Sequence, residues 1–142
     1  EAYPPEELSM DTAKMKRICV FMNVFNVHVN RSPVLGQAER IVYKKGKFLN
    51  ASLDKASDKN ERSSLVISTE SGTKIIVVQI AGLIARRILS FISQDQLLVQ
   101  GERFGLIRFG SRVDIYMPLD AETKCKVGDK VTAGESILAL LK

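Results

Sequence analysis

The chain has 142 residues, of which 45% are hydrophobic and 26% charged, and its formal net charge is +5. These values are typical of one globular domain that buries a core. No apolar run approaches the ~20 residues that span a bilayer, and no signal-peptide pattern is present. Basic and aromatic residues do not interleave as they do in proteins that stack bases, so nucleic acid is a poor candidate partner.

The first third of the sequence predicts an irregular lead-in followed by strands. Residues 1–15 lack a clear period, and residues 16–22 are apolar and rich in β-formers. In residues 23–30, alternation with period two puts His28 on one strand face with Val24, Asn26 and Asn30. Pro33 ends this run because it has no N–H to donate to a ladder.

The middle of the sequence predicts hairpins. Residues 39–43 predict a short strand. Residues 44–47 contain a glycine and predict a hairpin connection. Residues 54–64 are polar and predict a loop. Residues 65–69 and 73–80 are β-branched runs around a Glu-Ser-Gly turn, which is a strong hairpin signal.

The last third is less uniform. Residues 79–92 favour a strand or a mixed segment, although their composition also suits a helix. Residues 124–127, 130–134 and 136–141, with Gly128-Asp129 after the first of them, predict a final pair of strands about a tight turn. The fold class we expect is therefore mainly β, a single domain of short antiparallel strands, barrel-sandwich-like, with a biotinyl/lipoyl-like hairpin at the C-terminus.

The charge and the cysteines leave alternatives open. A net charge of +5 indicates either an ordinary solvated surface or attraction to an anionic partner such as a membrane leaflet. Cys19 lies in an apolar run and is predicted to be in the core, and its spacing from Cys125 is not that of a metal or redox site. A reducing compartment is the default for such a chain.

A Gly-Ser pair at residues 110–111 lies between the apolar runs 104–109 and 113–117. By itself such a pair marks a bulge, a bend or a close backbone approach. Four segments in one order carry more information: 20–33 (VFMNVFNVHVNRSP), 46–62 (GKFLNA, KAS and NER), 78–87 (VQIAGLIARR) and 101–118 (GERFGLIRFGSRVDIYMP). Together they resemble the phosphatidylserine decarboxylases, in particular their short, non-mitochondrial branch (type II, archaetidylserine decarboxylase-like).

The resemblance implies a zymogen that cleaves itself between Gly110 and Ser111. Residues 1–110 would become the β chain and residues 111–142 the α chain, and Ser111 would become a pyruvoyl group, the cofactor. The ketone would bind the amine of phosphatidylserine as a Schiff base, and the carboxy-lyase would release carbon dioxide and phosphatidylethanolamine. A glycine before the serine permits strained backbone dihedrals.

The resemblance also assigns other residues. His28 is the only histidine of the chain. It would activate the serine hydroxyl or move a proton during decarboxylation, and a structural role is the alternative. Arg62, Arg86 and Arg87 are weaker candidates for binding the lipid phosphate, since each could be an ordinary surface or ion-pair arginine.

The implied partners are phosphatidylserine at an anionic membrane surface and the cleaved α and β chains, and oligomerisation stays open. The implied location is peripheral, on the cytoplasmic face of the cell membrane. The family's membrane segment and its aspartate in an Ala-Asp-Gly-like motif are not found in these residues, and the resemblance places both upstream of residue 1.

Two non-enzymatic alternatives remain. Residues 127–139 resemble half of a biotinyl/lipoyl carrier hairpin, but the Ala-Met-Lys-Met tetrapeptide that such carriers modify does not occur. A basic β-rich binding module, in which the Gly-Ser pair is merely a bulge, is the other alternative.

Overall fold

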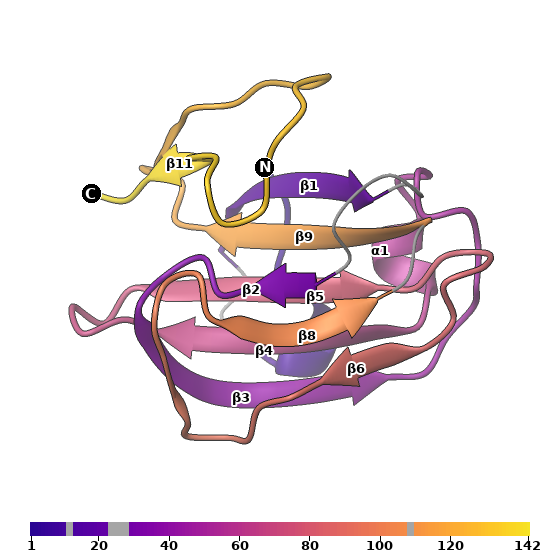
Figure 1. The fold of residues 1–142 in the computed structure, drawn as a ribbon, viewed down its shortest axis with the longest axis horizontal. Coiled ribbons are helices and arrows are strands. Elements are labelled where there is room, and N and C mark those ends of the chain that lie inside the picture. The colour runs from indigo at the N-terminus through magenta and orange to yellow at the C-terminus, as the bar shows by residue number, and fades with distance from the viewer. Residues whose placement is uncertain (11–12, 23–28, 108–109) are drawn as a thin grey trace.

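The computed structural model describes residues 1–142 except 11–12, 23–28 and 108–109 (Figure 1). Strands dominate the described residues, in which helix is confined to a 3-10 turn, η1 (Glu6–Leu8), and one short α-helix, α1 (Ala56–Lys59). The strands are β1 (Lys16–Met22), β2 (Val29–Arg31), β3 (Gly36–Lys44), β4 (Arg62–Ser68), β5 (Lys74–Ile80), β6 (Ile88–Ser90), β7 (Leu97–Leu98), β8 (Arg103–Ile107), β9 (Ser111–Met117), β10 (Glu122–Thr123) and β11 (Ala139–Leu140).

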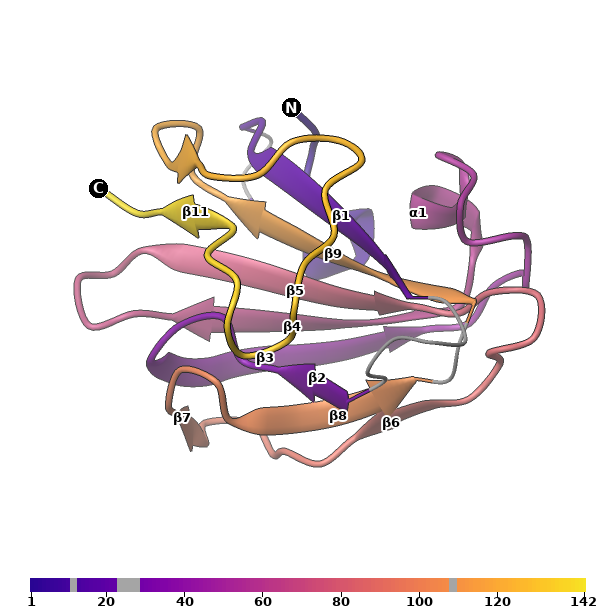
Figure 2. The same cartoon turned by 45° about the horizontal axis from the view of Figure 1, so that its top comes forward.

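Two antiparallel sheets pack face to face. The larger sheet has the order β1-β9-β5-β4-β3-β7, and the smaller has the order β2-β8-β6. In Figures 1 and 2 the smaller sheet lies as a second layer over one face of the larger one. The mainly β, antiparallel prediction is confirmed, and the described residues form an open sandwich rather than a closed barrel.

Apolar side chains on the inner face of the larger sheet form the main core. Alternate residues of β4, β5 and β9 point into it, among them Ile67, Val77 and Val113, and Phe104 reaches it from β8. Alternation therefore puts Ser111, two residues before Val113, on this inner face.

A second apolar cluster covers the outer face of the same sheet. Val66, Ile76 and Tyr116 pack there beneath Leu8 of η1 and Ala56 of α1. Strands β4 and β5 are buried on both faces, and the sequence of β5 is accordingly a nearly continuous apolar run, whereas β4 begins with a buried arginine and two buried serines. The lead-in, residues 1–15, thus contributes a buried leucine although most of its described residues are irregular.

The hairpin predicted around residues 70–72 is present. Strand β4 pairs with β5, and the N–H of Gly72, which has φ +87°, donates to the carbonyl of Thr69 (2.9 Å). Residues 81–87 are irregular before β6 begins, which agrees with the mixed prediction for residues 79–92. The predicted loop at 54–64 instead contains α1 and the start of β4.

Two predicted connections are wrong. Residues 44–47 do not close a hairpin, because β3 pairs with β4 across the whole 45–61 segment. A Cβ at Gly46 would lie 2.6 Å from the carbonyl oxygen of Lys59, so this glycine serves a close backbone approach instead of a turn.

The C-terminal hairpin also differs from its prediction. A turn does occur at Gly128, where the N–H of Asp129 donates to the carbonyl of Lys126 (3.1 Å). The strand expected at 124–127 does not form. Residues 139–140 of the expected strand 136–141 do form a strand, β11, but its partner is β10, which ends before residue 124. Val127 is fully exposed, so this segment has no buried face that would hold an alternating strand. In the described part of the chain, no helix is long and apolar enough to cross a bilayer.

Candidate functional site

The Gly110–Ser111 junction forms a bend at the start of β9. Gly110 has φ +77°, a conformation that is accessible to glycine and strained for other residues. Its N–H donates to the carbonyl of Met22 (2.7 Å), and Ser111 pairs with Met22 across β1 and β9. Ser111 is fully buried. The β1 backbone therefore holds the peptide bond on which the sequence prediction centres.

The loop after β5 confines the carbonyl of Gly110. A Cβ at Gly82 would lie only 1.9 Å from the Gly110 oxygen, so this oxygen occupies the space that a side chain would need. The N–H of Gly82 donates to the carbonyl of Ala85 (3.0 Å), which closes a two-residue tip of Leu83 and Ile84. Glycine at 82 is thus required by the close approach of two backbone segments.

A buried charged network lies directly behind the junction, on the outer face of the sheet. The Arg112 Nε atom is 2.8 Å from Asp114 Oδ1, and its two Nη atoms bond to Asp114, to Ser57 Oγ and to the carbonyls of Ala51 and Leu53. Ser57 Oγ donates to Asp114 Oδ2 (2.8 Å). Arg112 is 4% exposed and Asp114 is fully buried, so the pair depends on these partners to offset its desolvation.

Cys19 lies opposite Asp114 in the β1–β9 register. The prediction that Cys19 belongs to the core is wrong, because the residue is exposed on the edge strand. Although the residue as a whole is exposed, partial desolvation of its thiol group and the neighbouring Asp114 carboxylate raise the pKa of Cys19 to about 11. The thiol is therefore almost fully protonated at neutral pH, which argues against a nucleophilic role.

Two amide side chains lie on the inner face near the junction. Gln79 Nε2 donates to Asn30 Oδ1 (2.8 Å), and Asn30 Nδ2 lies 3.7 Å from the sulfur of Met22, the residue opposite Ser111. Both amides are at least nine-tenths buried. Gly105 leaves room for this pair, since a Cβ there would lie 2.4 Å from Gln79 Nε2.

The three arginines predicted to bind the lipid phosphate differ in burial and in their partners. Arg62 is 2% exposed, and its Nε and Nη2 atoms each lie 2.7 Å from a carboxylate oxygen of Glu7. It therefore has the ion-pair role that the sequence left open. Arg86 and Arg87 are exposed, and the guanidinium of Arg86 lies 5.0 Å from the ring centroid of Phe48. His28 lies outside the described residues.

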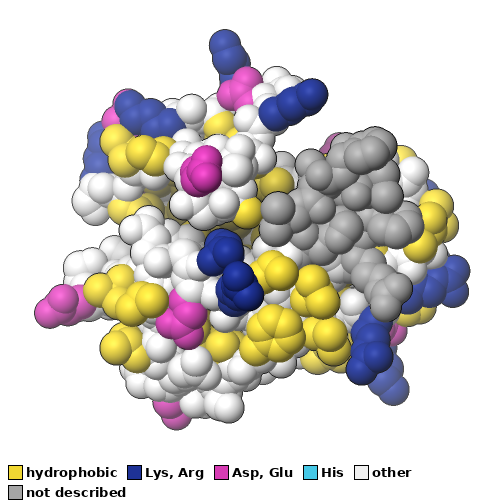
Figure 3. Space-filling view, in the orientation of Figure 1, with side chains coloured by type: hydrophobic (Ala, Val, Ile, Leu, Met, Phe, Trp, Pro, Cys, Tyr) yellow, Lys and Arg dark blue, Asp and Glu magenta, His cyan; other side chains and the backbone are white. Residues whose placement is uncertain are grey.

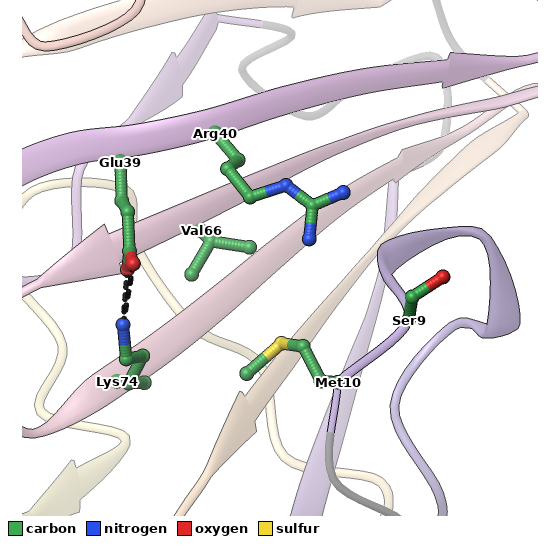
Figure 4. Close-up of a pocket in the computed structure, with 6 residues that line it drawn as sticks. All are labelled: Ser9, Met10, Glu39, Arg40, Val66 and Lys74. Carbon is green, nitrogen blue, oxygen red and sulfur yellow. Dashed lines mark hydrogen bonds and ion pairs between the residues drawn. The ribbon is translucent and has the colours of Figure 1, made fainter.

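A cavity of about 260 Å³ opens on the outer face of the larger sheet (Figure 4). It is lined by Ser9, Met10, Glu39, Arg40, Val66 and Lys74. The Lys74 ammonium lies 2.6 Å from Glu39 Oε1 at one wall. Lys74 begins β5, whereas Arg112 pairs with Ile80 at the other end of that strand. The cavity is thus remote from the junction, and none of its described lining residues is one predicted as functional.

Neither Gly82 nor the Arg112–Asp114 pair is predicted as a site feature from the sequence. One signal was present for the pair, because Arg112 and Asp114 are charged residues at alternate positions of an apolar strand. Comparison with known proteins adds one positive finding: the phosphatidylserine decarboxylase family model matches residues 2–139. No solved structure gave a significant match.

Proposed function

Because the chain belongs to the phosphatidylserine decarboxylase family, a family of carboxy-lyases that convert phosphatidylserine to phosphatidylethanolamine, we propose that it makes a pyruvoyl cofactor from its own Ser111. One observation carries the proposal: a fully buried serine follows a glycine of φ +77° whose carbonyl is confined by Gly82. Family membership favours the enzyme over a non-enzymatic binding or carrier module.

In the proposed cleavage, Ser111 Oγ attacks the carbonyl carbon of Gly110. A C–O bond forms, the amide C–N bond breaks, and the hydroxyl proton passes to the released amine. Loss of the Ser111 α-proton and of the Gly110 carboxylate leaves dehydroalanine, which water converts to a pyruvoyl group with release of ammonia. The β chain then ends at Gly110, and the α chain begins at position 111.

Positioning is the main contribution that the described residues make to this reaction. The hydrogen bond from Gly110 to Met22 fixes one side of the junction, and contact with Gly82 limits rotation of the reacting carbonyl. Restricting such motion supplies up to ~7–11 kcal/mol in well-oriented intramolecular reactions. A pyruvoyl ketone, once formed, withdraws electrons from the bond that loses carbon dioxide.

We propose His28 as the group that moves protons. Its support is in the sequence: it is the only histidine, and it lies in a segment that resembles the family. An imidazole titrates near neutral pH, which suits it to accept the Ser111 hydroxyl proton or to transfer a proton during decarboxylation.

Arg86 and Arg87 are the proposed ligands of the lipid phosphate. Both are exposed and follow Gly82 by only a few residues, so they belong to the loop that contacts the Gly110 carbonyl. Guanidinium groups match phosphate geometry. Arg62 is a poorer candidate, since its guanidinium is buried against Glu7. The proposed location is peripheral, at the cytoplasmic face of a membrane that contains the substrate.

Denaturing gels and intact mass test the cleavage, and carbon dioxide release from phosphatidylserine tests the enzyme. We expect two fragments from the wild-type protein, the smaller with a blocked first residue at position 111. Ser111→Ala should remain one chain and release no carbon dioxide, whereas Ser136→Ala, at an exposed serine, should behave as wild type. Decarboxylation by Ser111→Ala would show the cofactor assignment to be wrong.

His28→Ala separates the two roles of the histidine. A chain that stays intact assigns His28 to cleavage. A chain that cleaves but releases no carbon dioxide assigns it to decarboxylation, and wild-type behaviour in both measurements would exclude the proposal for His28.

A further inference from the structure

The loop between β5 and β6 projects two large apolar side chains into solvent beside the junction. Leu83 is 54% exposed and Ile84 is 67% exposed, whereas Gly82 and Ala85 on either side of them are buried. The hydrogen bond from Gly82 to Ala85 fixes the base of this pair, which we name the 83–84 tip. Adjacent exposed apolar residues on such a fixed base indicate a binding surface more strongly than single apolar residues scattered over a protein.

Basic side chains flank the 83–84 tip. Arg86 and Arg87 are exposed, and Arg86 is held in place because its Nε donates to the carbonyl of Leu83 (2.9 Å) and its guanidinium stacks over Phe48. Leu53, 42% exposed, belongs to the segment whose carbonyl accepts from Arg112 behind the junction. Figure 3 shows hydrophobic and basic side chains next to each other at the end of the molecule where β5 ends and β9 begins.

We propose that the 83–84 tip, together with Arg86 and Arg87, docks on the anionic bilayer that carries the substrate. The inference rests on the proposed function, because it takes the junction beside the tip as the reaction site. Apolar side chains enter the acyl boundary of the leaflet while cationic side chains remain at the level of the anionic head groups. The charge of the surface is complementary to such a leaflet.

A second copy of the chain fits this surface less well. Two apolar residues offer far less area than the ~800 Å² that each partner buries in a stable interface. In a symmetric dimer through the tip, Arg86 and Arg87 would also face their own copies, and like charges brought together repel. A bilayer imposes neither requirement, since it deforms around a small tip and supplies negative charge.

The contact between Gly82 and Gly110 places a membrane-docked tip next to the proposed reaction site. The base of the tip touches the carbonyl at the junction, so a leaflet that holds the tip also holds lipid head groups close to Ser111. The lipid then reaches the site without leaving the membrane, and its apolar tails stay out of water.

Vesicle co-sedimentation tests the docking without relying on decarboxylation. The vesicles contain phosphatidylcholine with or without phosphatidylglycerol, an anionic lipid that lacks the serine head group. We expect wild-type protein to bind the anionic vesicles, and Leu83→Ser/Ile84→Ser to bind them about tenfold more weakly. Arg87→Gln should weaken binding about fivefold, and added salt should weaken it further.

A matched control is available away from the junction. Leu97 and Val127 are 65% and 106% exposed, so Leu97→Ser/Val127→Ser also removes two exposed apolar side chains and should bind as wild type. Ile84→Ser alone should weaken binding in the same direction as the double variant, and an unchanged urea midpoint for either variant shows that the fold is kept. Ser111→Ala should bind as wild type, so failure of the cofactor proposal is distinguishable from failure of docking.

Three outcomes would overturn the inference. One is binding of Leu83→Ser/Ile84→Ser to anionic vesicles with wild-type affinity, and another is no binding by the wild type. The third is a change of oligomeric state in Leu83→Ser/Ile84→Ser without loss of vesicle binding, which would assign the tip to an interface between copies of the chain.

Discussion

The carbonyl oxygen of Gly110 occupies the space that a side chain at Gly82 would need: a Cβ at position 82 would lie 1.9 Å from that oxygen. The two residues belong to different loops, one after β5 and one before β9. Their contact defines where the Gly110 carbonyl points. A sequence change at 82 should therefore act on the chemistry at 110.

Gly82→Ala should block or strongly slow self-cleavage. The added methyl group displaces the Gly110 carbonyl, and a displacement of ~1 Å in a reacting group costs about 100-fold in rate. The measurement is the fraction of cleaved chain over time on a denaturing gel.

Gly36→Ala is the matched control for Gly82→Ala. A Cβ at Gly36 would lie 2.7 Å from both Ile67 and the Ser68 carbonyl, so this change is also crowded but lies away from the junction. It should destabilise the protein and leave the cleavage rate near that of wild type. Equal cleavage by Gly82→Ala and wild type would contradict the positioning role of Gly82.

Arg112 and Asp114 should be coupled in stability. Arg112→Met leaves a fully buried carboxylate without its guanidinium, and such a loss costs about 3–5 kcal/mol. Arg112→Met/Asp114→Leu removes both charges and should recover most of that stability. Urea unfolding of the two single variants and the double variant measures the coupling, and additive effects would show that the pair acts as two independent residues.

The strands of the larger sheet were predictable because their sequences are locally consistent. Residues 65–69 and 73–80 combine β-branched side chains with a Glu-Ser-Gly turn, and β4 and β5 form the predicted hairpin there. Ser111 could be singled out because four segments share one order with a known family. That resemblance is confirmed by the family match over residues 2–139.

Contacts between distant loops were not predictable. Gly46 lies in a predicted hairpin connection, and Gly82 lies in a segment predicted as strand or mixed. Each instead makes room for a backbone further along the chain, at Lys59 and Gly110. Arg62 has the same sequence signal as Arg86, but its place in β4 and its contacts with Glu7 and the Ser57 carbonyl bury it, whereas Arg86 is exposed. Such differences depend on tertiary packing, which no local pattern encodes.

Cys19 should react slowly with alkylating reagents. Its pKa is raised to about 11 from an ordinary 9.0, so at pH 8 it should react about 100-fold more slowly than an unperturbed thiol. Mass spectrometry of Cys125→Ser, which retains Cys19, measures this rate. The rate should keep rising above pH 9, and a plateau there would contradict the effect of burial and Asp114 on the thiol.

The Glu7–Arg62 ion pair should make stability depend on acid pH. Burial opposes ionisation of Glu7, but hydrogen bonds from Arg62 and its positive charge outweigh burial and hold the pKa of Glu7 below 4.5. A carboxyl whose pKa is lower in the folded state stabilises it fully above the unfolded pKa, and this stabilisation is lost as pH falls through the folded pKa.

Glu7→Gln should therefore lower the free energy of unfolding by about 1.5–3 kcal/mol near pH 7, because the buried Arg62 loses its hydrogen bonds to a charged carboxylate. The difference from wild type should shrink as pH falls below 4.5, since the wild type then loses the same interaction. Urea unfolding at several pH values measures it. Glu6→Gln is the control, because the Glu6 side chain is 82% exposed and its pair with Lys44 lies in solvent. A difference between Glu7→Gln and wild type that does not change with pH would show that the Glu7 side chain stabilises the fold by packing and not by its charge.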